Sequence, residues 1–465
     1  MFLKRMKKDY LNDVFKMLLW TLLFLVLFSF IPEIKIGSFT SRKVDMLSDI
    51  RLVKPRPRPE LQNQIAVADT IIPDTVVVKK DTVVIRKDPE RVHDGIVLFE
   101  DYSDDESGLS HLCNAMDNSE NRPVRIAFLG DSFIEADILT QNIREELQGR
   151  FGGRGVGYVP MTSMTAGFRR TVIHQFSRWS TVSVVNHTKP DKSSLSIAGQ
   201  YFTAEDGASA TFKGTSALKS LDVFGSAKFL FVNRENTEIK LTVNKEEPRI
   251  YTPFPADSLQ CIEVEGEISS LNIKLSRPSG FTAFGVYLND KTGICVDNYS
   301  LRGTSGTNLA QVNLLLSHEM SQYVNYDLIV LEYGQNVVSR DVYNYNSYAE
   351  RMIKVVRHLK ECYPESDILI MGVGDRSKRG TRGFETMPEI YEMIDAQRKV
   401  AQETKSVFWD TFTAMGGENS MLSYVEHKPV WANKDYTHIT HAGGRPIAAK
   451  FVEALLYRYN RGKSL

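Results

Sequence analysis

The sequence predicts an α/β protein with a parallel sheet, a β-rich segment inserted into it, and an apolar segment near the amino terminus. Three observations lead to this prediction. In residues 96–154 and 288–465, short apolar runs ending in polar or glycine turns alternate with stretches of helical spacing. Residues 155–287 instead show short alternating runs between turn residues, with little helical periodicity. The run Met17–Ile31 is uncharged and strongly apolar.

The α/β elements are expected in two groups. In the first, the strand Val124–Leu129 is followed by helical spacing of apolar residues as far as Gly149. In the second, Pro446 should mark the start of the last helix, Ile447–Tyr459. The other elements expected there are strands Gly293–Asp297, Asp327–Glu332, Asp367–Val373 and Ser406–Asp410, and helices Tyr348–Tyr363 and Met387–Thr404.

Gly130-Asp131-Ser132 follows the first of these strands directly. A serine on a tight strand-to-helix turn lies at the carboxyl edge of a parallel sheet, where open α/β folds bind their ligands. Asp131 is expected to order this turn. Alternatively, the tripeptide is only an Asp/Ser helix cap.

Three further polar segments follow in order, most of them at strand ends. The first is the glycine turn Arg302–Asn308, with Gly306 near its centre. The second is Tyr333-Gly334-Gln335-Asn336, after the strand Asp327–Glu332. The third is Asp435-Tyr-Thr-His438, just before the final helix.

This order resembles the SGNH (GDSL) hydrolase family of esterases and acyltransferases, over roughly residues 96–170 and 290–460. Its blocks are matched by Gly130-Asp131-Ser132, the turn around Gly306, Gly334-Gln335-Asn336 and Asp435-Tyr-Thr-His438. Val337 stands where the family has an aspartate, so the third block is the weaker match. The resemblance implies a three-layer α/β/α fold.

The residue types themselves suggest a nucleophilic mechanism. Ser132 would attack an ester carbonyl after passing its proton to His438, because a hydroxyl is a weak nucleophile at neutral pH. Asp435 would hold the other ring nitrogen of His438 and stabilise the imidazolium. The backbone N–H groups of Ser132 and Gly306 and the side-chain amide of Asn336 would form the oxyanion hole.

Other interpretations of these residues remain open. Asp435 and His438 could be a surface pair, and His441 could be a rival base. Asp435, His438 and His441 together could suggest a metal site, but no further His or Cys cluster completes a ligand set, so no metal and no cofactor are expected. The charged segment Asp375–Arg382 should lie at the rim of the site, either as a contact for an acidic glycan or peptide or as a solvated loop.

The inserted segment, residues 155–287, is predicted to be a β-sandwich, jelly-roll-like, with about eight strands. Its position resembles that of the carbohydrate-binding-like module in bacterial peptidoglycan O-acetylesterases and their O-acetyltransferase relatives. Nine aromatic side chains in the insert could stack on sugar rings, although most should be core: Phe176, Trp179, Tyr201, Phe202, Phe224, Tyr251, Phe254, Phe281 and Phe284.

The amino terminus predicts an uncleaved signal anchor, with a cytoplasmic tail over 1–16 and a transmembrane segment over 17–32. A cleaved signal peptide is the alternative. Residues 33–95 look like an extended stalk, with a Pro-rich run and a seven-residue repeat over 74–87. The expected location is therefore the inner membrane, single-pass, with the catalytic part outside the cytoplasm.

The 57 basic and 57 acidic residues cancel, which gives no reason to expect nucleic acid as a partner. The four cysteines, 113, 261, 295 and 362, show no metal spacing, and their pairing is open. We expect a serine esterase or acetyltransferase acting on O-acetyl groups of a cell-envelope glycan. A transferase would need an acetyl donor, and a membrane-bound O-acyltransferase is the partner that the resemblance implies. The alternatives are a lipase or thioesterase, and a non-catalytic envelope scaffold.

Overall fold

The computed structural model describes residues 10–28, 35–36, 39–40, 89–185, 189–381 and 383–463. The chain forms two compact units, residues 1–84 and 85–465. In the first, helix α1 (Tyr10–Phe28) contains residues 17–28 of the predicted anchor, and β1 (Lys35–Ile36) pairs with β2 (Phe39–Thr40). The rest of that anchor, residues 29–32, the first nine residues of the predicted tail, and residues 41–88 of the predicted stalk, with the repeat, lie outside the described residues.

Within the described ranges, no helix combines the length and the apolar character that crossing a bilayer requires. The anchor therefore stays a prediction from the sequence.

The second unit is built on a six-stranded sheet in which five strands are parallel and the edge strand β5 is antiparallel. Its order is β16 (Gly293–Ser300), β6 (Pro123–Gly130), β17 (Leu328–Glu332), β18 (Asp367–Met371), β21 (Val407–Trp409) and β5 (Phe99–Asp101). The parallel strands thus follow the order 2-1-3-4-5, and the chain reverses direction across the sheet between β6 and β17. Ligands bind beyond the strand ends at such a reversal.

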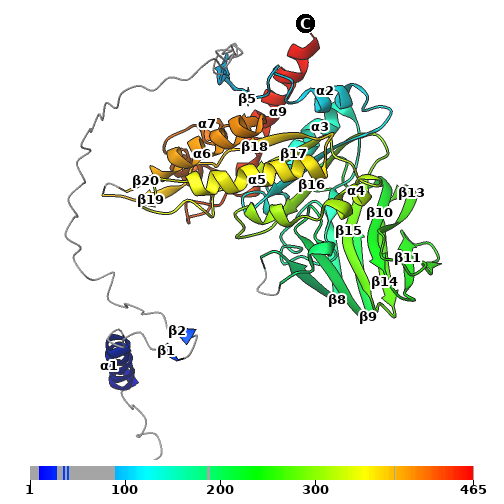
Figure 1. The fold of residues 1–465 in the computed structure, drawn as a ribbon, viewed down its shortest axis with the longest axis horizontal. Helices are drawn as coiled ribbons and strands as arrows, with labels where there is room; N and C mark the ends of the chain where they lie inside the picture. Colours follow the sequence, from blue (N-terminus) through cyan, green and yellow to red (C-terminus); the bar gives the residue numbers. More distant parts are fainter. Residues whose placement is uncertain are drawn as a thin grey trace, which may run out of the picture. The chain divides into compact units, whose positions relative to one another are not determined.

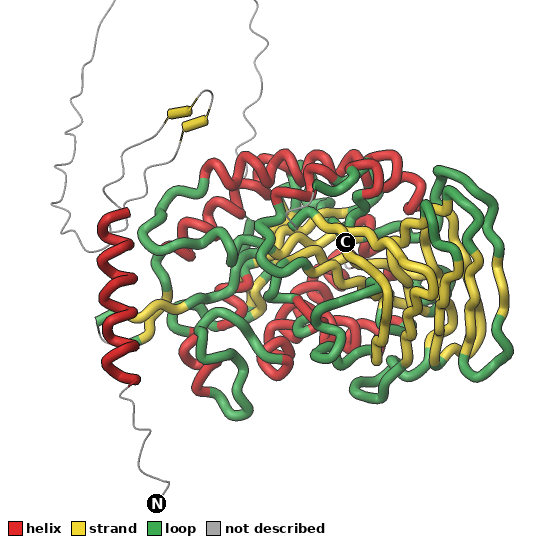
Figure 2. The backbone as a smooth tube through the Cα atoms, turned by 90° about the horizontal axis from the view of Figure 1, so that it is seen from below, coloured by secondary structure: helices red, strands yellow, loops and turns green. Residues whose placement is uncertain are grey.

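Alternating residues of the sheet pack into two separate cores. On β6, Ile126 and Phe128 belong to one core, and Ala127 and Leu129 belong to the other. Because successive side chains of a strand point to opposite faces, each face must be covered by helices. Figure 2 shows these helices above and below the strands, which confirms the three layers.

The helices divide between the faces in keeping with these cores (Figure 1). One face is covered by α2 (Ser110–Asp117), α3 (Thr140–Phe151), α8 (Ser420–Glu426) and α9 (His441–Lys463). The other is covered by α4 (Leu314–Ser321), α5 (Asn346–Cys362) and α6 (Glu389–Thr404), while α7 (Thr411–Met415) contributes to both cores.

Two expected helix boundaries were wrong. The helix after Ser132 begins only at Thr140, because Ala136 and Asp137 adopt positive φ angles of 53° and 63° and break the helical path. The last helix begins at His441, so Pro446 lies inside it rather than at its start. Thr440 caps this helix by accepting the N–H of Gly443 on its hydroxyl, one turn before the proline.

The insert is a single antiparallel sheet of nine strands that curls over its own core, rather than two separate sheets. Its strands are β7 (Gly157–Val159), β8 (Ile173–Ser183), β9 (Gln200–Lys213), β10 (Phe224–Asn233), β11 (Glu238–Val243), β12 (Arg249–Tyr251), β13 (Gln260–Ile268), β14 (Ser270–Ser276) and β15 (Phe281–Asn289).

The curl comes from β9, which pairs with β15 near its start and with β14 near its end. Gly207, at φ 77°, lies between these two regions. The neighbouring strand β8 has a bulge between Ser177 and Trp179, where Arg178 also has a positive φ. Bulges and glycines of this kind bend a strand, and so they join the two expected layers into one sheet.

Most of the insert's nine candidate aromatic residues are buried, as expected. Only Phe176 and Phe254 among these nine are exposed by more than a third, at 36% and 69%. The four cysteines lie in the described part of the chain, and none of them forms a disulfide bond there.

Candidate active site

Ser132 lies just beyond the end of β6, in a turn that its neighbours fix. Gly130 has no room for a side chain, because a Cβ there would come 2.9 Å from the carbonyl oxygen of Glu332 on β17. The carboxylate of Asp131 accepts the backbone N–H of Phe133 at 2.9 Å, so it orders the turn as expected. The serine is thereby presented at the reversal point of the sheet.

The structure brings together Ser132, His438 and Asp435, which together are called the relay below. The Oγ atom of Ser132 lies 3.0 Å from Nε2 of His438. The Nδ1 atom of the same ring lies 2.9 Å from Oδ2 of Asp435. This is the hydrogen-bond order that a serine nucleophile, a general base and an orienting carboxylate require.

Asp435 is suited to remain ionised. Its partial burial favours the neutral acid, but the backbone N–H groups of His438 and Thr437 and the His438 ring outweigh this and lower its pKa. Both N–H groups donate to Oδ1 at 3.0 Å, which leaves Oδ2 for the ring. The side chains of His438 and Asp435 are 44% and 49% exposed, so the relay is open to water.

A hairpin supports the loop that carries the histidine. It consists of β19 (Ser377–Arg379) and β20 (Phe384–Thr386), from the charged segment 375–382 and the residues after it. The N–H of Ser377 donates to the carbonyl of Tyr436 at 3.1 Å. The segment is therefore partly structural, and Asp375 is fully buried; Arg382 is not among the described residues.

The relay opens into a cleft of about 340 Å³. Most of the residues that line it are polar. The lining consists of Asp131, Ser132, Phe133, Gln335, Asn336, Val338, Ser339, Arg376, Asp435, Thr437 and His438. Arg376 donates to the carbonyls of Gln335 and Val338, both at 3.1 Å, and so holds the loop that contains Asn336. The sequence pointed to the segment of Arg376 but not to this role.

Two of the three predicted oxyanion donors, Asn336 and Gly306, already donate to other groups of the protein. Asn336 lines the cleft, and its amide donates to Oδ2 of Asp131 at 2.8 Å and to the carbonyl of Thr304 at 3.1 Å. Gly306 is not among the lining residues, and its N–H donates to the hydroxyl of Thr304 at 3.2 Å. Thr304 therefore engages both groups, a role that sequence reasoning missed.

Gly306 is nevertheless a position that only glycine fits. Its φ is 80°, and a Cβ there would lie 2.5 Å from the ring of Tyr333. His441, the rival base, lies at the start of α9, and its ring packs on Phe168 at a centroid distance of 4.9 Å. Its burial lowers its pKa.

Two buried carboxyl groups, Asp131 and Glu332, lie beside Ser132. Burial raises the pKa of Asp131 to about 6, against the hydrogen bonds from Phe133 and Asn336. Burial, and then the charge of Asp131, raise the pKa of Glu332 well above its usual value. Both effects favour the neutral acid of Glu332 beside Asp131.

Comparison with known proteins gives one strong structural likeness. No family model and no curated protein sequence matches the chain. A solved structure of a peptidoglycan O-acetylesterase matches with a TM-score of 0.64 and 21% sequence identity, over 78% of this chain and 99% of that chain.

Two carbohydrate esterase structures match less well. One is a family 2 enzyme with a carbohydrate-binding domain from Corynascus thermopiles (Myceliophthora fergusii), with a TM-score of 0.29 and 12% identity over 61% of this chain and 99% of that one. The other is a family two enzyme from Cellvibrio japonicus, with a TM-score of 0.26 and 9% identity over 62% of this chain and 99% of that one. The chain thus has the fold of the peptidoglycan O-acetylesterase, and the predicted parallel α/β sheet with an inserted β domain is confirmed.

Proposed function

We propose that this protein is a serine O-acetylesterase that removes acetyl groups from hydroxyls of a cell-envelope glycan, through an acetyl-serine intermediate on Ser132. The observation that carries the proposal is the continuous relay from Ser132 through His438 to Asp435, at 3.0 and 2.9 Å, beside an open polar cleft. The shared fold with a peptidoglycan O-acetylesterase supports the choice of substrate class.

In the first half of the reaction, the Oγ atom of Ser132 bonds to the acetyl carbonyl carbon while its proton passes to Nε2 of His438. The carbonyl oxygen becomes an oxyanion, for which the N–H groups of Ser132 and Gly306 and the amide of Asn336 are the donors. For two of these, the oxyanion would have to replace Thr304 or Asp131 as acceptor. The bond from carbon to the sugar oxygen then breaks, and His438 returns the proton to that oxygen.

In the second half, water attacks the acetyl-serine and gives its proton to His438. Acetate leaves, and the proton returns to Ser132. A sugar hydroxyl in place of water would make the same chain an O-acetyltransferase, with a membrane-bound O-acyltransferase as acetyl donor. The exposure of His438 and Asp435 favours water as the acceptor.

A lipase or thioesterase is less well supported, because an acyl-chain site needs an apolar cleft. Here nine of the lining residues are polar or charged, and Phe133 and Val338 are the two apolar ones.

We also propose that the protein acts at the envelope side of the inner membrane, held by its amino-terminal apolar segment. The support is the sequence of Met17–Ile31, with Lys4, Arg5, Lys7, Lys8 and Lys16 before it. Fractionation of cells that express the full chain, followed by protease treatment of intact spheroplasts, tests this. Membrane-bound chain that the protease digests is expected, and chain recovered in the cytoplasm would contradict it.

The enzymatic proposal is tested with the full chain, wild type and Ser132→Ala, on O-acetylated and de-acetylated cell-wall oligosaccharides. Mass spectrometry follows acetate loss from the first and acetyl gain by the second from an activated acetyl ester. Acetate loss that depends on Ser132 is expected. Gain that outpaces hydrolysis of the donor would make the protein a transferase, and equal activity of Ser132→Ala would exclude the mechanism.

A further inference from the structure

A second cavity, of about 320 Å³, lies where the insert meets the α/β part of the chain. Glu135, Asn298 and Arg302 line it from the α/β side, and Tyr158, Thr181 and Gln200 line it from β7, β8 and β9 of the insert. Its volume is at the small end of the range for ligand pockets, about 300–1,000 Å³.

This cavity shares two segments of chain with the catalytic cleft. Glu135 follows Ser132 by three residues, which span at most about 11 Å. Arg302 precedes Thr304 by two residues, and the Thr304 carbonyl accepts the amide of Asn336 in the cleft. The cavity therefore lies close to the catalytic cleft, although the two have no lining residue in common.

The lining is polar but carries little net charge. Apart from Tyr158 and Asn298, seven of its lining residues have hydroxyl or amide side chains: Thr162, Ser163, Thr165, Thr181, Ser183, Gln200 and Ser300. The hydroxyl of Tyr158 is enclosed, and the amide of Asn298 donates to Ile134 and Thr140 instead. Its ions are paired with one another: Nε of Arg302 donates to Glu135 at 3.0 Å, and Nη2 of Arg169 lies 2.7 Å from Asp137. Neutral donors and acceptors suit an uncharged polyhydroxy ligand, and the described residues of the lining offer no unpaired cation for a phosphate.

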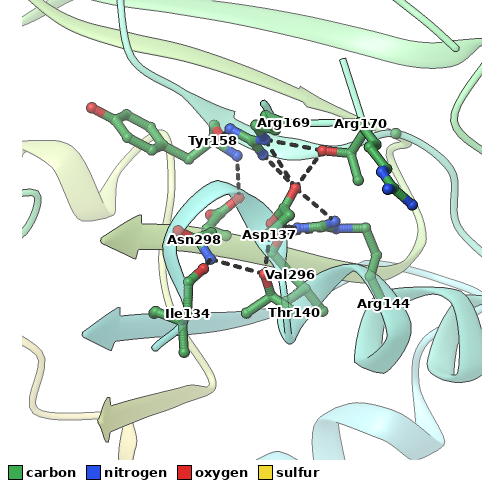
Figure 3. A network of polar contacts seen from close by, with 12 residues as sticks. Ile134, Asp137, Thr140, Arg144, Tyr158, Arg169, Arg170, Val296 and Asn298 are labelled. Atoms are coloured by element: carbon green, nitrogen blue, oxygen red, sulfur yellow. Dashed lines mark hydrogen bonds and ion pairs between the residues drawn. The ribbon is translucent and has the colours of Figure 1, made fainter. Parts of the chain in front are cut away.

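The cavity wall is held by a buried network centred on Asp137 (Figure 3). Arg144 of α3 donates to its carboxylate at 3.1 and 3.2 Å, and Arg169 donates at 3.0 Å. Burial alone would raise the pKa of Asp137, but these two arginines lower it below its usual value. Because Asp137 belongs to the turn after Ser132, the network fixes the 160–172 segment against the nucleophile's own turn.

We infer that this cavity is a saccharide subsite, which binds an uncharged sugar unit next to the unit whose acetyl group lies at Ser132. The inference rests on the proposed function and deepens it, because the enzyme would then recognise a stretch of glycan rather than a single acetylated sugar. Activity should rise when the substrate is lengthened from one sugar to a short oligosaccharide.

Two variants of the full chain test the subsite. Gln200→Ala removes one amide from the wall, and Thr162→Trp fills the cavity. Lys274→Ala, at an exposed position on β14 of the insert, is the matched control. Each is assayed on an O-acetylated oligosaccharide and on 4-nitrophenyl acetate, which is too small to need the subsite.

We expect both cavity variants to lose about tenfold or more in kcat/KM on the oligosaccharide, mainly through KM. Their activity on 4-nitrophenyl acetate, and both activities of Lys274→Ala, should equal those of the wild type. Wild-type kinetics on the oligosaccharide in Gln200→Ala and Thr162→Trp would overturn the subsite and leave the proposed esterase standing.

A binding measurement separates the two proposals further. Calorimetry gives the Kd of the de-acetylated oligosaccharide for Ser132→Ala and for Ser132→Ala with Thr162→Trp. A Kd about tenfold weaker in the double variant is expected. An equal Kd in the two proteins would overturn the subsite, whatever the esterase assay shows.

Discussion

The ring of Phe384 stacks on the ring of Tyr436, with centroids 3.7 Å apart and planes within 9° of parallel. Phe384 lies on the hairpin strand β20, and Tyr436 lies between Asp435 and His438 of the relay. Tyr436 has a φ of 56°, a conformation that is costly for a bulky side chain and that must be held by its surroundings. The stack and the Ser377–Tyr436 hydrogen bond supply that support.

Phe384→Ala should therefore lower kcat by about tenfold or more, because small displacements of a base are costly in rate. Phe384→Tyr keeps the ring and should behave like the wild type. The rate of labelling of Ser132 by a fluorophosphonate should fall in parallel with kcat, while the thermal unfolding midpoint changes little. Unchanged labelling of Phe384→Ala would show that the hairpin does not position the histidine.

Asn336→Ala should lower kcat by about 10²–10³, the usual loss when one oxyanion donor is removed. An oxyanion donor acts on the charge that develops in the transition state, so KM should change little. Ser339→Ala, which alters an exposed residue in the lining of the same cleft, is the matched control and should stay near the wild type. If Asn336→Ala keeps its rate, then the bonds to Asp131 and Thr304 are structural, and the oxyanion donors lie elsewhere.

Asp137→Asn should destabilise the fold by about 3–5 kcal/mol, because it leaves two buried guanidinium groups without their counter-charge. Arg234→Gln breaks an exposed pair with Asp257 and should cost less than about 1 kcal/mol. Denaturant titration of the full chain measures both free energies of unfolding. If the two variants lost the same free energy of unfolding, the Asp137 network would not hold the insert to the α/β part.

The buried carboxyl of Asp131 should make stability depend on pH. Its pKa is about 6 in the fold against 3.8 for the free side chain, so between about pH 4 and 6 the folded state binds more protons than the unfolded one. The contribution of Asp131 to stability is thus largest at low pH and is lost as pH rises through 6, by at most about 1.4 kcal/mol per pH unit.

The measurement is the free energy of unfolding of the wild type minus that of Asp131→Asn, taken from pH 4 to pH 7. This difference should fall across the window and then become flat. A difference that rises with pH would show instead that the N–H groups of Phe133 and Asn336 stabilise the carboxylate more than burial opposes it.

Local sequence patterns predicted the sheet well, and they picked out three residues that the structure brings within hydrogen-bond distance of one another. Ser132, Asp435 and His438 each lie in a short contiguous motif beside a strand or helix with clear periodicity, so their positions follow from local sequence. The strands expected around Val124–Leu129 and Asp327–Glu332 are present as β6 and β17 within two residues at each end. Strands that are buried on both faces appear in the sequence as continuous apolar runs, so they are easy to recognise.

Features set by distant contacts were not predictable from the same signals. Asp137 has a positive φ angle, and its carboxylate is bound by Arg144 and Arg169. No local sequence pattern predicts that network. The carbonyl of Thr304 accepts the amide of Asn336, and Arg376 donates to the carbonyl of Gln335, in both cases across more than 30 residues of sequence. The curl of the insert depends on which parts of β9 pair with β14 and β15, and strand pairing is not encoded in alternation alone.

Ser132 is expected to react covalently, with His438 as its base. Treatment of the full chain with a fluorophosphonate, followed by peptide mass spectrometry of the wild type, Ser132→Ala and His438→Ala, locates the adduct. One adduct is expected, on Ser132 of the wild type, absent from Ser132→Ala and formed much more slowly in His438→Ala. An adduct on another residue, or labelling of Ser132 that is unaffected by the loss of His438, would exclude this mechanism.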